Sequence, residues 1–242
     1  MTLILTLLTS LALANTTDEY TWDVTLNGNK VGERSLTVEN VDDPNNPRRV
    51  LRSYTSIEAS VLGRSASFEQ RMTAVAGLGP AAFHAAVRQD GVASEYQGRR
   101  DGMGWTVTSV ERRGARSEDL PSNAIDLSTA DLMDPGSRVP IWTFEEARVL
   151  TTEDGLIWQT PVTRLGTETV TIDGQDVRVE GYEIEPPAGK MRLWYAAGGV
   201  LVKYSWKWMG VRAEGVLQDP HTPTVDTTPA VDDGPTVTEM EL

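Results

Sequence analysis

The stretch MRLWYAAGGVLVKYSWKWMG, residues 191–210, decides the fold class of this chain. Its second half places large apolar side chains at every second position: Val200, Val202, Tyr204, Trp206 and Trp208. Successive side chains of a β-strand point to opposite faces, so a period of two is typical of a strand with one buried face. Gly198-Gly199 supplies a turn before this strand. The whole stretch therefore predicts a β-hairpin.

The same alternation continues along the rest of the chain. Residues 20–26 alternate and meet a turn signal at Asn27-Gly28, and residues 167–172 and 175–185 flank Asp173-Gly174. Near Gly181 the apolar parity switches, which predicts a β-bulge. We therefore expect an all-β fold of about a dozen antiparallel strands, because turn signals recur between strand-length segments. A sheet of that size curls or closes, so a large curved sheet or an open β-barrel is predicted.

One short helix is expected among these strands. Ser128 and Asp131 have the spacing of a capping box, and Pro135-Gly136 ends the segment. We predict a helix near residues 128–134 that covers one opening of the sheet. Residues 144–150 are expected to form a further strand.

Both ends of the chain differ from the middle. Residues 1–14 are apolar and end in Ala12-Leu13-Ala14, the small-residue pattern of a cleavage site. We predict a signal peptide and export to the periplasm or the outside of the cell; a buried N-terminal strand or helix is the alternative. Residues 219–242 hold six acids, four prolines and no Lys or Arg, which predicts a disordered acidic tail. Residues 15–218 are expected to form a single β-rich domain.

Composition excludes several classes of function. The chain has 22 Lys and Arg, 35 Asp and Glu, a net charge of −13 and no Cys. Nucleic acid is not an expected partner, because binding its phosphates requires an excess of cations. Without Cys there is no disulfide, thiolate metal site or cysteine nucleophile. No segment is long and apolar enough to predict a transmembrane helix.

Four segments together resemble a family of exported bacterial β-rich proteins of unknown function. They are YTWDVTLNGNKVGERSLTV (20–38), NAIDLSTADLMDPGSRVPI (123–141), LGTETVTIDGQDVRVEGYEI (165–184) and the hairpin at 191–210. The shared features are turn glycines and core aromatics, so the resemblance implies an exported antiparallel-β protein and carries over no catalytic residue. The layout is more distantly similar to periplasmic lipoprotein-sorting carriers, whose half-barrel holds acyl chains under a helical lid.

The candidate ligand-binding residues are Trp194, Tyr204, Trp206 and Trp208. Aromatic side chains inside a curved sheet can line a pocket for a lipid or another apolar ligand. An ordinary packed core is the alternative. Five arginines near one expected hairpin could bind an anionic head group or the acidic tail, or protect a sheet edge; they are Arg99, Arg100, Arg112, Arg113 and Arg116.

Acid–base chemistry has less support. Neighbouring acids occur at Asp42-Asp43, Glu118-Asp119, Glu145-Glu146 and Asp131…Asp134, and we expect them on solvated surface. We predict no catalytic residue, no metal site and no cofactor, and the sequence does not indicate an oligomeric state. The leading hypothesis is a non-enzymatic envelope protein that binds an apolar or amphipathic ligand, or an envelope partner, in its curved sheet. The alternatives are a hydrolase of envelope polymers and a scaffold without a ligand.

Overall fold

A computed structural model describes residues 16–41, 48–61, 63–76, 80–102, 104–137, 140–187, 189–208 and 211–219. The predicted signal peptide and nearly all of the predicted tail lie outside these residues, as do Asp42 and Asp43. Within the described ranges, the chain contains no helix that is long and apolar enough to cross a membrane.

The described chain forms one sheet of fifteen strands. The strands are β1 (Thr16–Leu26), β2 (Asn29–Val41), β3 (Arg48–Val61), β4 (Arg64–Ala76), β5 (Pro80–Gln89), β6 (Val92–Asp101), β7 (Gly104–Glu111), β8 (Gly114–Pro121), β9 (Leu127–Ser128), β10 (Glu146–Leu150), β11 (Ile157–Ile172), β12 (Gln175–Ile184), β13 (Met191–Ala196), β14 (Leu201–Trp208) and β15 (Val211–Leu217), with the 3₁₀-helix η1 (Ile141–Thr143) between β9 and β10. The all-β, curved-sheet prediction is confirmed, with more strands than expected.

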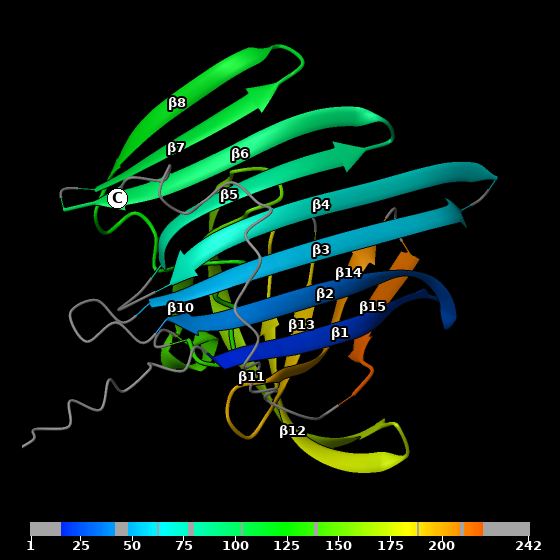
Figure 1. The fold of residues 1–242 in the computed structure, drawn as a ribbon. Coiled ribbons are helices and arrows are strands. Elements are labelled where there is room, and N and C mark those ends of the chain that lie inside the picture. The colour runs from blue at the N-terminus through cyan, green and yellow to red at the C-terminus, as the bar shows by residue number, and fades with distance from the viewer. Residues whose placement is uncertain are drawn as a thin grey trace, which may run out of the picture.

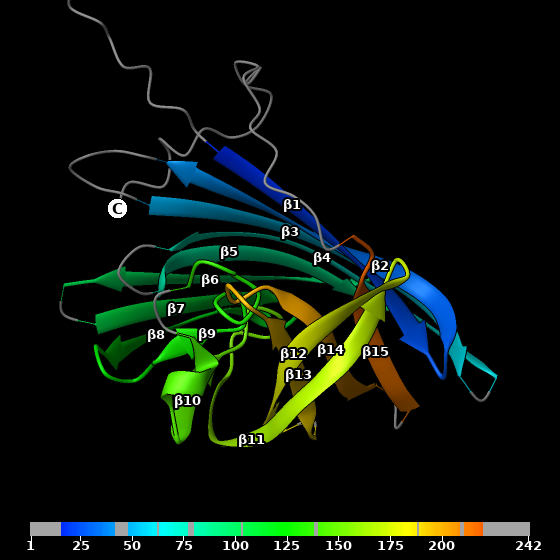
Figure 2. The same ribbon diagram turned by 90° about the horizontal axis from the view of Figure 1, so that it is seen from below.

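The order across the sheet is β8-β7-β6-β5-β4-β3-β2-β1-β15-β14-β13-β12-β11-β10-β9. Neighbours are antiparallel except β9 and β10, which are parallel. Figures 1 and 2 show that β1–β8 make one wall and that β11–β15 turn away at a steep angle to make a second wall. The two edge strands, β8 and β9, are joined by residues 122–126, which can span only about 20 Å. The sheet is therefore an open barrel whose edges approach each other at one end.

The predicted hairpin turns lie where the sequence places them. Asn27, Asp90 and Asp173 adopt positive φ, each followed by a glycine with positive φ. That backbone matches the twist of tightly connected antiparallel strands. A register shift lies on β11 between Arg164 and Gly166, directly across from Gly181 on β12. The expected irregularity near Gly181 is present, with the extra residue on the neighbouring strand.

The short helix predicted near residues 128–134 is not formed. Residues 127–128 pair as β9, and the following residues make successive turns through the bonds Asp131 N–H to Ser128 O and Met133 N–H to Ala130 O. The capping interaction itself is present, because Asp131 Oδ2 accepts hydrogen bonds from the Ser128 amide and hydroxyl. Pairing of β9 with β10 holds Ser128 in a strand, so the cap stabilises a turn instead of a helix. The predicted strand in residues 144–150 is confirmed as β10.

The hydrophobic core lies between the two walls and includes the chain between β8 and β11. Leu36 and Leu51 contribute from the first wall, and Ile184 and Leu193 contribute from the second. Further buried members come from residues 122–150: Ile125, Leu127, Ala130, Leu132, Met133, Ile141, Ala147, Val149 and Leu150. We call residues 122–145 the inner segment. It fills much of the space that an empty half-barrel would leave open.

Candidate functional site

The inner segment is attached to the first wall by a buried ion pair. Arg49, at the start of β3, donates from Nε and Nη2 to Oδ2 of Asp134, at 3.1 and 2.7 Å. The Gly136 amide donates to the other oxygen of the same carboxylate at 3.0 Å. A side chain at position 136 would meet the guanidinium, since a Cβ built there lies 2.3 Å from Arg49 Nη1. The absence of a side chain at Gly136 therefore lets the arginine approach.

A second carboxyl group of the inner segment is also buried. Asp131 is bonded to Ser128 at 2.6 and 2.7 Å, and burial raises the pKa of Asp131 and of Asp134. Arg49 partly opposes that rise at Asp134. The expectation that Asp131 and Asp134 are solvated is therefore wrong, because the surrounding loop folds into the core instead of forming an exposed helix.

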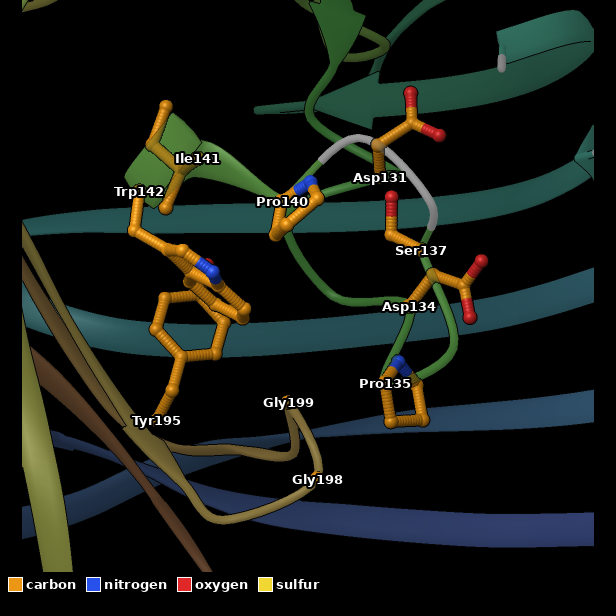
Figure 3. Close-up of a pocket in the computed structure, with 10 residues that line it drawn as sticks. All are labelled: Asp131, Asp134, Pro135, Ser137, Pro140, Ile141, Trp142, Tyr195, Gly198 and Gly199. Atoms are coloured by element: carbon orange, nitrogen blue, oxygen red, sulfur yellow. The ribbon is translucent and has the colours of Figure 1, made fainter. Parts of the chain in front are cut away.

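A cavity of about 190 Å³ lies beside these acids. Figure 3 shows it between the inner segment and the turn that joins β13 to β14. It is lined by Asp131, Asp134, Pro135, Ser137, Pro140, Ile141, Trp142, Tyr195, Gly198 and Gly199. The carboxyl groups of Asp131 and Asp134 point away from the Trp142 and Tyr195 rings (Figure 3). The side of the cavity nearer the rings is therefore mainly aromatic and prolyl.

Three aromatic rings form this side of the site. Trp142, on η1, stacks on Tyr182 with centroids 5.9 Å apart and meets Tyr195 edge-on at 5.3 Å. The Tyr195 hydroxyl donates to Leu132 O at 2.9 Å, and burial raises its pKa far above the ordinary tyrosine value. Trp142 itself is 41% exposed. A large indole is thus held by packing at the mouth of the cavity while part of its surface stays open.

A row of polar side chains faces the interior from the first wall. Arg34, Thr55 and Gln70 are in register across β2, β3 and β4. Gln70 Nε2 lies 3.4 Å from Thr152 Oγ1, and Arg34 Nη2 lies 3.5 Å from Glu153 Oε1. Thr55 Oγ1 and Arg34 Nε are buried with no hydrogen-bond partner among the described residues. Buried polar atoms without partners are uncommon in native proteins.

Neither this row nor Trp142 was predicted from the sequence. The row carries a signal, because Arg34, Thr55 and Gln70 stand at the same parity as buried apolar neighbours on their strands. Polar residues at core parity indicate either a buried network or a site. Trp142 carries no periodic signal, because it lies in a single turn of 3₁₀-helix.

The residues predicted to bind ligand are not all brought together. Tyr204 and Trp206 stack with centroids 5.4 Å apart, and Trp22 meets Tyr204 edge-on at 6.5 Å. Trp194 is opposite Lys203 in register, so it lies on the other face of the sheet, where the Lys203 ammonium sits 4.8 Å from its ring centroid. The side chain of Trp208 lies outside the described part of the structure. A ligand-binding role for these residues stays a prediction.

The five arginines do not form one patch. Arg99 and Arg100 lie at the β6–β7 turn, whereas Arg112 and Arg113 lie in the β7–β8 turn at the opposite end of β7. Arg116 is paired with Ser109 within the hairpin. Across the described ranges, no group of three or more His, Asp and Glu side chains could hold a metal ion.

Comparison with known protein families matches residues 22–217 to a domain of unknown function, DUF6134. The chain belongs to the DUF6134 family. The matched residues include the second half of β1, all of β2 to β15, and the inner segment. This confirms the expectation of a β-rich family whose function is unknown.

Among solved structures, the DUF6134 domain is similar to the crystal structure of a β-barrel-like protein of another domain of unknown function, DUF1849, from Brucella abortus. The TM-score is 0.58 at 10% sequence identity, and the match covers 84% of this chain and 95% of that chain. At that identity the likeness shows the fold alone. The comparison with curated proteins found no match.

Proposed function

We propose that this protein is an exported, non-enzymatic binding protein of the bacterial envelope. Its ligand is amphipathic, and the apolar end of that ligand occupies the cavity beside Trp142. The observation that supports this proposal is the indole of Trp142, held against Tyr182 and Tyr195 at the cavity mouth yet 41% exposed. An exposed tryptophan leaves a large apolar surface in contact with water, and aromatic side chains that line a concave site are typical ligand contacts.

The size of the cavity limits the ligand. At about 190 Å³ it is smaller than sites that bury a drug-sized molecule, which have volumes of about 300–1,000 Å³. It therefore accommodates one end of a ligand, while the polar remainder lies outside. A carrier that encloses a whole acyl chain would need the space that the inner segment fills with its own apolar side chains.

The hydrogen bonds and orientation of Asp131 and Asp134 favour ligand binding over hydrolysis as the function. Asp134 accepts from Arg49 and Gly136, and Asp131 accepts from Ser128. A pair of catalytic carboxyls must face a shared substrate across a cleft. Here both groups point away from the rings (Figure 3) and serve to attach and shape the inner segment.

Export is supported by residues 1–14, whose apolar run and Ala12-Leu13-Ala14 end have the form of a cleaved leader. The mass of the protein recovered from a bacterial periplasm tests it. A mature N-terminus at Asn15 supports export, whereas an intact Met1 in the cytoplasmic fraction contradicts it.

The ligand proposal is tested by native mass spectrometry of the periplasmic protein, followed by solvent extraction and lipid analysis. An adduct that is present under native conditions, lost on denaturation and recovered in the extract supports a binding protein. If the native protein has the mass of the polypeptide alone and does not bind an added fluorescent fatty acid, the ligand proposal is contradicted. A scaffold without a ligand would then be favoured.

A further inference from the structure

Strand β8 ends the sheet with one edge unpaired among the described residues. It pairs with β7 on one side only (Figure 1). All of its residues except Leu120 are exposed. An exposed strand of this length is a template for adding another strand. We infer that β8 is the docking edge for β8 of a second copy of this chain, in antiparallel orientation.

The turns of the first wall determine which backbone groups of β8 are free. Asp90 and Gly91, both with positive φ, form a two-residue turn that places Gln89 opposite Val92. The two residues that flank such a turn form backbone hydrogen bonds with each other. Hydrogen-bonded and non-hydrogen-bonded residue pairs then alternate along the two strands. When this alternation is continued across β6 and β7, the even-numbered residues of β8 are those whose backbone groups bond to β7. Ala115, Ser117 and Asp119 therefore direct their backbone N–H and C=O groups to the free edge.

The free backbone groups also limit the register in which two β8 strands can pair. An antiparallel pair of identical strands has a two-fold axis, and only pairings that place odd-numbered residues opposite each other use the free backbone groups. With the axis at Ser117, Arg116 of each copy lies opposite Glu118 of the other. These are non-hydrogen-bonded positions, where cross-strand side chains are closest.

The neighbouring registers are unfavourable by the same rule. An axis at position 116 places two Arg116 side chains opposite each other, and an axis at position 118 does the same with two Glu118 side chains. Like charges directly opposite destabilise a strand pair. The sequence GARSEDLP of β8 is thus self-complementary in charge in the register whose axis lies at Ser117. This self-complementarity favours a second copy of the chain over a partner of different sequence.

The test is sedimentation velocity and light scattering of the full chain over a wide range of concentration. The wild type should show a concentration-dependent dimer. R116E and E118R should each weaken it by about tenfold or more, because each places like charges together twice. The charge swap R116E/E118R should restore dimerisation, which a general effect on folding would not do.

A backbone variant provides an independent check. S117P removes an N–H that points to the free edge and leaves the β7 pairing intact, whereas S117A keeps that N–H. We expect loss of the dimer in S117P, retention in S117A, and unchanged circular dichroism in both. A wild type that is monomeric at every concentration, or a charge swap that fails to restore the dimer, would overturn the inference. A dimer that is retained by R116E, E118R and S117P would place the contact elsewhere and overturn it equally.

Discussion

Arg49 on β3 donates two hydrogen bonds to Oδ2 of Asp134, at 3.1 Å from Nε and 2.7 Å from Nη2. The Asp134 side chain is fully buried and that of Arg49 is 19% exposed. This pair joins the inner segment to the first wall and holds the loop that borders the Trp142 cavity. The open barrel is therefore shaped from within by a polar contact as well as by apolar packing.

Removing Arg49 should destabilise the protein substantially. R49M leaves the Asp134 carboxyl buried without its cation, and breaking a buried pair on one side costs about 3 kcal/mol. Urea unfolding followed by tryptophan fluorescence measures the loss. The double variant R49M/D134L removes both charges and should recover much of it. Equal stability of R49M and wild type would show that the contact does not hold the inner segment.

The stability difference between D131N and wild type should depend on pH. Burial raises the pKa of Asp131 above its ordinary value of 3.8, so the folded state favours the protonated acid. The contribution of this group to stability is therefore largest at low pH and is lost as pH rises through the raised pKa. Asn is neutral at every pH, and its amide oxygen can still accept from Ser128. We expect D131N to be at least as stable as wild type at pH 7, with that relative advantage falling as pH approaches 3.8. A difference that is constant across pH would contradict the burial of this carboxyl.

Substitutions at two adjacent glycines distinguish the free-energy cost of backbone strain from that of a steric clash. Gly198 and Gly199 both have positive φ, but only a Cβ at Gly199 meets another group, Pro135 O at 2.6 Å. G198A should cost about 1–2 kcal/mol, the usual penalty for a left-handed alanine. G199A should cost about 1–3 kcal/mol more, because the hairpin turn must move away from the inner segment. Thermal unfolding of both variants measures this, and equal losses would show that the turn and the inner segment do not touch.

Thr55 in the buried polar row and Thr160 on β11 differ in whether the hydroxyl has a partner. Thr55 Oγ1 has no partner among the described residues, whereas Thr160 Oγ1 accepts from the Glu185 amide at 2.7 Å. T55V should be neutral or stabilising, because it removes an unpaired buried hydroxyl. T160V should cost about 1 kcal/mol, because it removes the acceptor of the partly buried Glu185 amide. Chemical denaturation of both variants decides the point, and a large loss in T55V would indicate a bound water or ligand on that hydroxyl.

Much of the sheet could be predicted because strand periodicity and turn chemistry are local. Asn27-Gly28 and Asp173-Gly174 fix hairpins by backbone conformation alone, and the alternation around Tyr204 defines a buried face. The prediction of a helix near residues 128–134 was wrong, because the Ser128–Asp131 hydrogen bond is compatible with either a helix or an isolated turn. Only the long-range pairing of β9 with β10 decides between them.

The site was less predictable because it depends on contacts between distant segments. Trp142 meets Tyr182 and Tyr195 from strands 40 and 53 residues later, and nothing local marks it. The partner of buried Asp134 is Arg49, which lies 85 residues earlier in the chain. Trp194 was grouped with Tyr204 because it lies on the neighbouring strand of the predicted hairpin, but the register puts the two side chains on opposite faces.

Ligand contact by Trp142 at the cavity can be measured by titrating the mature protein with 11-(dansylamino)undecanoic acid and following dansyl fluorescence. Wild type should bind saturably. W142A should bind about tenfold more weakly or worse, the expected effect of losing an aromatic anchor. L156A, which truncates another exposed apolar side chain outside the cavity, should bind as wild type does. Equal affinity of wild type and W142A, or no saturable binding by wild type, would contradict the claim.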